Sequence, residues 1–237
     1  MEAPLSRHNF VISIRDDRSM HRLPFPFVLS AALSLQILGG AWITGTDHRL
    51  WLGWNLFLAW VPVPLVAFAL YAEEQKRPIA CGTSALLAWL FFPNTIYLIT
   101  DLQHIHGEGT SAFHWLRTTL IGSAAIAGAS LAVILSEAFR ARIALRRGEL
   151  VSWLAAALLW LTTGLGVWLG RVQRWNSWDA ILAPHHVVRD VLALFTAPMA
   201  HLNAWFITLL FAALVAVLQV GSRMTDLATR RASRNEW

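Results

Sequence analysis

Charged residues are scarce in this sequence. Asp, Glu, Lys and Arg together account for 14% of the 237 residues, whereas a typical soluble domain carries about 25%. Hydrophobic residues account for 56%, and several apolar runs approach the roughly twenty residues that a helix needs to cross a bilayer. Composition therefore argues against an ordinary soluble domain and predicts a membrane protein. The net charge of +5 does not indicate a nucleic-acid partner, because the basic residues lie in short groups between the apolar runs.

Cysteine and catalytic motifs are also nearly absent. Cys81 is the only cysteine, which excludes an intrachain disulfide and a cysteine-based zinc cluster. The sequence contains no G-x-S-x-G, no G-x-x-x-x-G-K-S/T and no dinucleotide-binding fingerprint. No cofactor is predicted. A removable signal peptide is not expected, because residues 1–23 are mostly polar and the first apolar run is too long for a signal sequence.

Six apolar segments, each close to the length of a membrane-spanning helix, organise the chain. They are Phe25–Ile43, Leu50–Tyr71, Ile79–Thr100, Leu116–Phe139, Leu150–Leu169 and His201–Val220. The polar stretches between them are too short for a folded soluble domain. The sequence therefore predicts an all-α, polytopic membrane bundle of about six transmembrane helices at 24–221, between a basic N-terminal segment (1–23) and a basic C-terminal tail (222–237).

Lys and Arg are distributed unevenly between the two sides that these segments define. With the N-terminus in the cytoplasm, fourteen of the nineteen basic residues fall on cytoplasmic segments; the others are Arg49, Arg117, Arg171, Arg174 and Arg189. This bias follows the positive-inside rule. We therefore expect both termini in the cytoplasm and the connections at 44–49, 101–115 and 170–200 on the outer side.

A polar stripe closes the third segment. Asn94, Tyr97, Asp101 and His104 follow one another at intervals of three and four residues, so a helix places them on one face. Pro93 is expected to kink this helix. Since polar groups are costly toward lipid, the stripe should line the bundle interior or a water-filled pocket near the outer face. Asp101 and His104 are the candidate catalytic acid or base and, as an alternative, a pair of metal ligands.

A second polar cluster, GRVQRWNSWD at 170–179, ends the fifth segment. It places Arg171, Arg174, Asn176 and Asp179 on the side of the membrane where basic residues are otherwise few. Guanidinium groups bind carboxylates and phosphates through paired hydrogen bonds. Arg171 or Arg174 is therefore expected to pair with Asp101, or alternatively to hold an anionic lipid head group.

Three further features concern the helices themselves. Asn55, near the outer end of the second segment, is expected either to hydrogen-bond to the third segment or to contribute to a site. Pro62 and Pro64 should break the second segment midway. Gly166 and Gly170 form a G-x-x-x-G pattern, which indicates close packing within the bundle in preference to dimerisation.

Histidines gather on the predicted outer side, at His48, His104, His106, His114, His185, His186 and His201. Imidazole and carboxylate groups are common metal ligands. A zinc signature such as H-E-x-x-H is absent, however, and no metal is predicted.

Three ordered stretches resemble a known family. WNLFLAWVP at 54–62, FFPNTIYLITDLQH at 91–104 and RWNSWD at 174–179 are similar to the bacterial multi-pass membrane family catalogued as domain of unknown function 1361. The resemblance implies a bacterial protein, for which the inner (cytoplasmic) membrane is the predicted location. It carries over no activity, but it emphasises Asn55, Pro93, Asn94, Tyr97, Asp101, His104, Arg174, Trp175, Asn176 and Asp179.

Three functions remain open from sequence alone. The first is an enzyme acting on a lipid or lipid-linked substrate at the outer boundary, with Asp101 or His104 as acid or base. Its ligand-binding residues would be Asn55, Asn94, Tyr97, Arg171, Arg174, Asn176 and Asp179. The second is an accessory subunit, in which these groups form an internal lock between the second, third and fifth segments. The third is a transport or small-ligand-binding protein, which the prolines favour and the absence of an internal repeat disfavours. Membrane lipids are the expected partners, with a membrane-protein partner or a homo-oligomer as alternatives.

Overall fold

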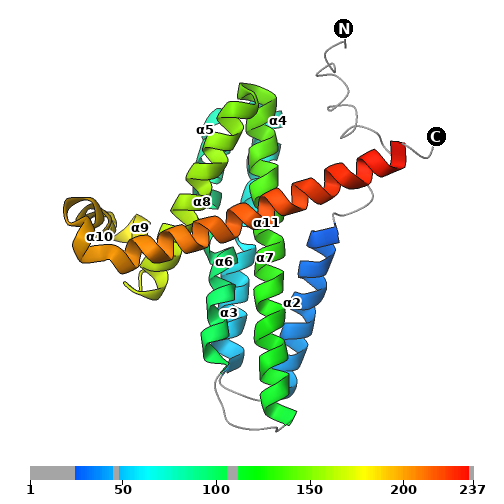
Figure 1. Ribbon diagram of the computed structural model, residues 1–237, viewed down its shortest axis with the longest axis vertical. Coiled ribbons are helices and arrows are strands. Elements are labelled where there is room, and N and C mark those ends of the chain that lie inside the picture. Colours follow the sequence, from blue (N-terminus) through cyan, green and yellow to red (C-terminus); the bar gives the residue numbers. More distant parts are fainter. Residues whose placement is uncertain (1–24, 45–47, 106–111, 235–237) are drawn as a thin grey trace.

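The protein is described by a computed structural model that covers residues 25–44, 48–105 and 112–234 (Figure 1). The predicted N-terminal segment 1–23 and His106 lie outside these ranges, as does the side chain of His48. Within the described ranges every regular element is helical, which confirms the predicted all-α class.

The chain forms a series of α-helices joined by short turns. Their order is α2 (Phe25–Thr44), α3 (His48–Trp60), α4 (Pro62–Glu74), α5 (Pro78–Phe91), α6 (Pro93–Thr100), the 3-10 helix η1 (Asp101–His104), α7 (Ala112–Arg147), α8 (Glu149–Arg171), α9 (Asp179–Leu182), α10 (Pro184–Thr196), the 3-10 helix η2 (Pro198–His201) and α11 (Leu202–Arg234).

Prolines divide two of the predicted segments as expected. The second segment separates into α3 and α4 at Pro62, and the third separates into α5 and α6 at Pro93. Proline has no amide hydrogen and its ring clashes with the preceding turn, so it interrupts a helix but is accommodated in the first turn of the next one. The junction residues Val61 and Phe92 keep helical backbone angles, and each pair still forms one membrane-length unit.

Five stretches of the described chain are long and apolar enough to cross a membrane. They are Trp51–Glu74, Pro78–His104, His114–Arg147, Glu149–Arg171 and Pro198–Thr225. The first predicted segment coincides with α2, whose apolar part, Pro26–Gly40, is shorter than these five. The structure therefore agrees with a multi-pass bundle, and the predicted total of six depends on this shorter helix.

The short helix α6 lies at the centre of the bundle. Its Leu98 is buried in one hydrophobic cluster with residues of α2, α3 and α7, while its Ile96 is buried in a second cluster with residues of α7, α8 and α11. Figure 1 shows α11 crossing α7 steeply, with α9 and α10 set apart at the side of the bundle. The turn residues that follow α6 and α8 are thus brought together beside α3.

Glycines allow the closest of these contacts. A Cβ atom on Gly164 would lie 2.0 Å from the Thr208 carbonyl oxygen of α11. Cβ atoms on Gly166 and Gly170 would meet Pro93 and Tyr97 of α6 at 2.6 and 2.8 Å. Both residues of the G-x-x-x-G pattern therefore serve packing inside the chain, as predicted.

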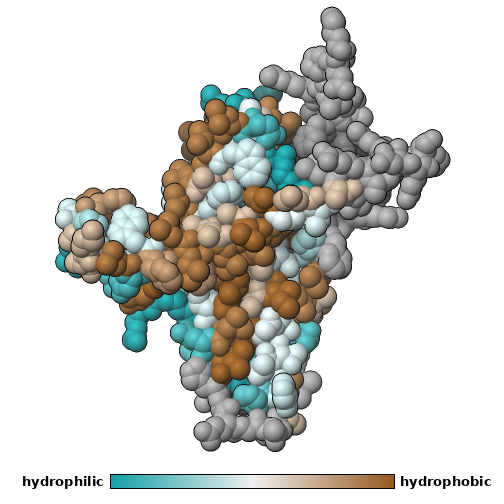
Figure 2. Space-filling model, in the orientation of Figure 1, coloured by the Kyte–Doolittle hydropathy of each residue, from teal (hydrophilic) through white to brown (hydrophobic). Residues whose placement is uncertain are grey.

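Large hydrophobic side chains are exposed along the outer surfaces of the helices. On α8, Leu154, Leu158 and Leu161 form one such stripe at helical spacing. Hydrophobic side chains also cover much of the face shown in Figure 2. Exposed apolar surface on this scale is expected where the surrounding solvent is lipid hydrocarbon.

A polar cluster around Arg140, not predicted from the sequence, joins α7, α8 and α11 at the end of the bundle opposite η1. Arg140 is buried and binds Glu137 (Nη2–Oε1, 2.6 Å) and Glu149 (Nη1–Oε2, 2.9 Å). From α11, Arg223 and Gln219 donate hydrogen bonds to Glu137 at 3.0 and 3.1 Å. Arginines that the sequence assigned to membrane orientation therefore also hold three helices together.

Candidate functional site

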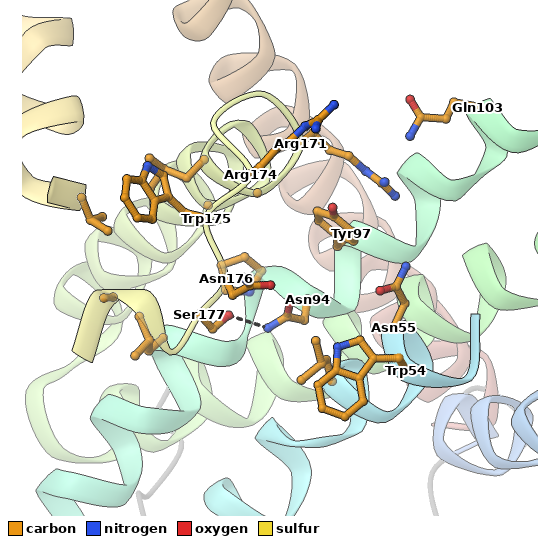
Figure 3. A pocket seen from close by; sticks show the side chains of 18 of the residues that line it. Trp54, Asn55, Asn94, Tyr97, Gln103, Arg171, Arg174, Trp175, Asn176 and Ser177 are labelled. Carbon is orange, nitrogen blue, oxygen red and sulfur yellow. Dashed lines mark hydrogen bonds between the residues drawn. The ribbon is translucent and has the colours of Figure 1, made fainter. Parts of the chain in front are cut away.

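A cavity of about 570 Å³ opens at the predicted outer end of the bundle, between α3, α6 and the turn that follows α8. Figure 3 shows its side chains converging from these elements. The polar lining consists of Asn55, Asn94, Tyr97, Gln103, His104, Arg171, Arg174, Asn176 and Ser177. The apolar lining consists of Trp54, Leu58, Leu90, Pro93, Gly166, Leu169, Gly170, Trp175, Ala180 and Val187.

Asp101 lies behind this lining, fully buried. Its Oδ2 accepts a hydrogen bond from Asn55 Nδ2 at 3.0 Å, and its Oδ1 accepts one from Arg171 Nη2 in a short ion pair. Because a buried carboxylate must be compensated by donors and opposite charge, these contacts tie α3, η1 and α8 together. We call Asn55, Asp101 and Arg171 the lock. The predicted pairing of an arginine with Asp101 therefore forms through Arg171, and not through Arg174.

Arg171 is held by three neighbours, of which Asp101 belongs to the lock. Its Nε donates to the hydroxyl of Thr100, and its guanidinium carbon stands 3.9 Å from the centre of the Tyr97 ring, in cation–π contact. The Arg171 charge is thus balanced by Asp101 and covered on one face by Tyr97. Arg171 therefore lines the cavity as a cation that already has a carboxylate partner within the protein.

The predicted polar stripe is divided between the cavity and the protein interior. Tyr97 and Asp101 both contact Arg171, as expected for residues on one face of a helix. Asn94, Tyr97 and His104 line the cavity, while Asp101 points into the protein toward Asn55 and Arg171. Both positions agree with the prediction that the stripe faces the bundle interior or a pocket.

Arg174 occupies the turn that leaves α8. Its backbone is left-handed, with a φ of 62°, a conformation that is uncommon for residues other than glycine. The following Trp175 N–H donates to the Leu169 carbonyl at 3.0 Å, which closes the turn. The Arg174 side chain is exposed and makes no ion pair or hydrogen bond with any other described residue. It is a cavity-lining cation whose charge is not neutralised by a neighbour.

Asn94 and Ser177 connect α6 to the same turn. Asn94 Nδ2 donates to the Ser177 hydroxyl at 2.9 Å and to the Phe91 carbonyl at 3.0 Å (Figure 3). Since Ser177 accepts the bond from Asn94, its own hydroxyl hydrogen remains available to donate. The cavity therefore offers a hydroxyl donor near the Arg174 turn.

His104 forms the opposite edge of the polar lining. Its ring is half-buried, 4.9 Å from the Trp51 ring centre, and its Nε2 lies 3.3 Å from Gln103 Nε2. The His104 carbonyl accepts a hydrogen bond from Arg117 of α7, which holds η1 in place. His104 thus lines the cavity from a backbone position that Arg117 stabilises.

The predicted site residues separate into two groups. Asn55, Asn94, Tyr97, His104, Arg171, Arg174 and Asn176 line the cavity. Asp101 does not line it, and neither does Asp179, which accepts hydrogen bonds from Asn176 N at 2.7 Å and Nδ2 at 3.2 Å. Gln103 was not predicted. Its position follows from the 3-10 turn, for which the sequence carries no clear signal.

The histidines do not assemble into one centre. His185 and His186 are neighbours, with ring centres 4.0 Å apart, and His186 stacks on Trp175. In the part of the chain that the structure describes, no three His, Cys, Asp or Glu side chains come together in an arrangement that suits a metal ion. Asp101, one of the two candidate ligands, already has both carboxylate oxygens bound by protein donors.

Comparison with known proteins gives one match. A family described as "Protein of unknown function (DUF1361)" matches residues 54–218, which is more than half of the chain and includes every residue of the cavity lining. No curated protein matches this chain, and no solved structure matches it.

Proposed function

Since the chain belongs to the family described as "Protein of unknown function (DUF1361)", we propose a function from the cavity itself. This multi-pass membrane protein binds the anionic head group of a lipid or lipid-linked molecule. Arg174 is the principal contact for the anion. The observation that carries the proposal is an uncompensated cation in a cavity whose lining changes from polar to apolar along the bundle.

The change in lining follows from chain direction. Along α3, Leu58 comes three residues after Asn55, which places it about 4.5 Å deeper in the bundle. Along α5 and α6, Leu90 precedes Asn94 by four residues and lies about 6 Å deeper by the same rise. Leu58 and Leu90 thus lie at the inner end of the cavity, whereas its polar residues lie toward the outer end, beside Trp54 and Trp175. An amphiphile whose acyl chain points into the bilayer matches this order.

The two cavity arginines have different roles in this proposal. Arg171 is held by Asp101, Thr100 and Tyr97, so it maintains the shape of the site. Arg174 is free to form charge-assisted hydrogen bonds with a phosphate or carboxylate. The Ser177 hydroxyl and the Asn176 amide lie in the same turn and add neutral donors.

The same geometry bears on catalysis. A general base needs an oxygen or nitrogen that can reach the substrate proton, and both oxygens of Asp101 are engaged inside the protein. We therefore propose a structural role for Asp101. Binding of the amphiphile is the function that the cavity supports best, and His104 is the one titratable candidate among the predicted catalytic residues that reaches the lining.

We also propose where the protein lies. The bias of basic residues and the family resemblance support the cytoplasmic membrane of a bacterium, with the cavity on the outer side. The cavity would then face the periplasmic boundary, where lipid head groups meet water.

Native mass spectrometry of gently extracted protein tests the binding proposal. Wild type is expected to carry a stoichiometric amphiphile with a phosphate or carboxylate, and Arg174→Gln is expected to lose it. The matched control is Arg189→Gln, which removes the same charge from the same predicted side but outside the lining. Wild type without a bound anion, or equal occupancy in the two variants at equal folded abundance, contradicts the proposal.

A further inference from the structure

The segment between α8 and α11 contains a helix with three distinct faces. α10 (Pro184–Thr196) has 13 residues, about 20 Å at the usual rise, which is too short to cross a hydrocarbon layer of about 30 Å. One face packs on the protein, one exposes hydrophobic side chains and one exposes polar side chains.

The packed face forms part of the cavity wall. Leu194 is buried against Trp168 of α8 and Ala204 of α11. Asp190 accepts a hydrogen bond from Trp175 Nε1 at 2.8 Å, and Val187 lines the cavity. α10 is therefore fixed to the bundle on this side and contributes Val187 to the cavity wall.

The exposed hydrophobic face follows helical spacing. Val188, Leu192 and Phe195 occur at i, i+4 and i+7, and they are 52%, 55% and 65% exposed. Hydrophobic exposure continues beyond the helix ends at Leu182 and Met199. The apolar stripe is thus continuous with the surface of α11, where Leu202 and Phe206 are also exposed.

The exposed polar face lies directly beside this stripe. It carries Arg189, whose side chain is 73% exposed, together with His185 and Thr196. Figure 2 shows hydrophobic and polar side chains next to one another on the lobe that α9 and α10 form. A helix with an apolar face, a basic polar face and too little length to cross the membrane is typical of helices that lie in the interface plane.

The position of α10 in the chain supports the same placement. α8 ends at Arg171 and the next membrane-length stretch begins at Pro198, so both ends of the intervening segment return to one side of the bundle. This is also the side on which the cavity lies. The exposed apolar face of α10 therefore lies at the cavity end of the bundle.

We propose that α10 lies in the lipid leaflet at the cavity end of the bundle, with Val188, Leu192 and Phe195 in the acyl region, and that the cavity behind it takes up its ligand laterally from that leaflet. Val187 and Val188 illustrate the arrangement, because these consecutive residues face the cavity and the exposed apolar stripe, respectively. The second half of this proposal rests on the proposed function, whereas the placement of α10 does not.

Spin labels test the placement of α10. Cys81 is the only cysteine, so a Cys81→Ala background accepts single labels through Val188→Cys, Leu192→Cys, Phe195→Cys, Arg189→Cys and Thr196→Cys. In bilayers, labels at the first three positions should collide more with oxygen than with an aqueous nickel chelate. The order should reverse at the last two. Equal nickel access at all five positions, or low access to both reagents at the apolar three, overturns the placement.

Two lipid probes test lateral uptake. Long-chain phosphatidic acid reaches the protein from the bilayer, whereas its dihexanoyl analogue reaches it from water with the same head group. In Leu192→Glu, the rate at which the long-chain probe is captured should fall at least about tenfold, an increase of about 1.4 kcal/mol in the barrier to entry. Binding of the short-chain probe should stay within about twofold. If Leu192→Glu loses both probes to the same extent, or retains both, lateral uptake is refuted. If wild type binds neither probe, both lateral uptake and the proposed function fail, but the spin-label result for α10 stands.

Discussion

Removing the charge of Asp101 should destabilise the fold without abolishing the ligand site. The substitution Asp101→Asn keeps the size of the side chain and leaves the Arg171 guanidinium facing a neutral amide. Asp101 is fully buried, and both of its oxygens are bound by Asn55 and Arg171. The loss therefore falls on the contact that joins α3, η1 and α8.

The expected size follows from the burial of the two partners. Removing one partner of a buried ion pair typically costs about 3–5 kcal/mol. The Arg171 side chain is 19% exposed, and it retains Thr100 and Tyr97, so we expect the lower end, about 3 kcal/mol. Arg171→Met should cost a similar amount. The double variant should lose less than the sum of the single variants by at least about 1 kcal/mol, because the two residues act as a pair.

Reversible unfolding by sodium dodecyl sulfate in mixed micelles measures these free energies. Ligand occupancy per folded molecule should remain close to wild type in Asp101→Asn. A stability change below about 0.5 kcal/mol, the range of ordinary surface substitutions, refutes the lock, and so does strict additivity of the double variant. Loss of ligand with full retention of stability would return Asp101 to the list of direct binding or catalytic residues.

Two further substitutions, each with a control, test the packing of α8 against α11 and the cluster around Arg140 by the same unfolding assay. Gly164→Ala places a Cβ atom 2.0 Å from the Thr208 carbonyl and should cost about 1–3 kcal/mol as α8 and α11 separate. The control Gly122→Ala adds a Cβ with no neighbour within 4 Å and should be neutral or stabilising by up to about 1 kcal/mol; equal effects contradict the packing argument. Arg140→Met removes the buried bonds to Glu137 and Glu149 and should cost about 2 kcal/mol. Arg147→Met, at an exposed position, should change stability by less than about 0.5 kcal/mol, and a similar loss in both variants would remove the special role of Arg140.

Sequence reasoning was most successful where one physical preference dominates. Long apolar runs have no stable alternative to helices in lipid, so the helical segments were predictable from hydropathy. Pro62 and Pro93 interrupt any helix that reaches them, and the breaks occur at both positions. The close contacts of Gly166 and Gly170 also followed from their spacing.

The details of the site depended on tertiary contacts that spacing does not encode. Helical periodicity predicted that Asp101 would share a face with Tyr97, and both residues contact Arg171. The full burial of Asp101 and its bond to Asn55 depend on how α3 and α8 pack against η1. The sequence allowed either Arg171 or Arg174 to be the partner of Asp101. Arg171 is the last residue of α8, whereas Arg174 has a left-handed backbone in the turn that follows. This difference between the two arginines depends on how the chain leaves α8.

The cluster around Arg140 was missed for a related reason. Its arginines match the positive-inside pattern, and that explanation was sufficient without any further role. Gln219 offered a signal, since it lies inside an apolar run and polar residues at such positions usually have partners. Its partners, Glu137 and Trp160, lie far away in sequence and become neighbours only through the crossing of α11 over α7 and α8.

The binding of phosphatidic acid to Arg174→Gly tests the central claim most directly. Glycine relieves the left-handed backbone at this position, so stability should be unchanged or raised by up to about 1 kcal/mol. Loss of a charge-assisted contact worth about 1.5–3 kcal/mol should weaken binding by at least about tenfold, measured by isothermal titration calorimetry against Arg189→Gln. Stability retained with affinity lost is the predicted result. An affinity within twofold of wild type would contradict Arg174 as the anion-binding residue.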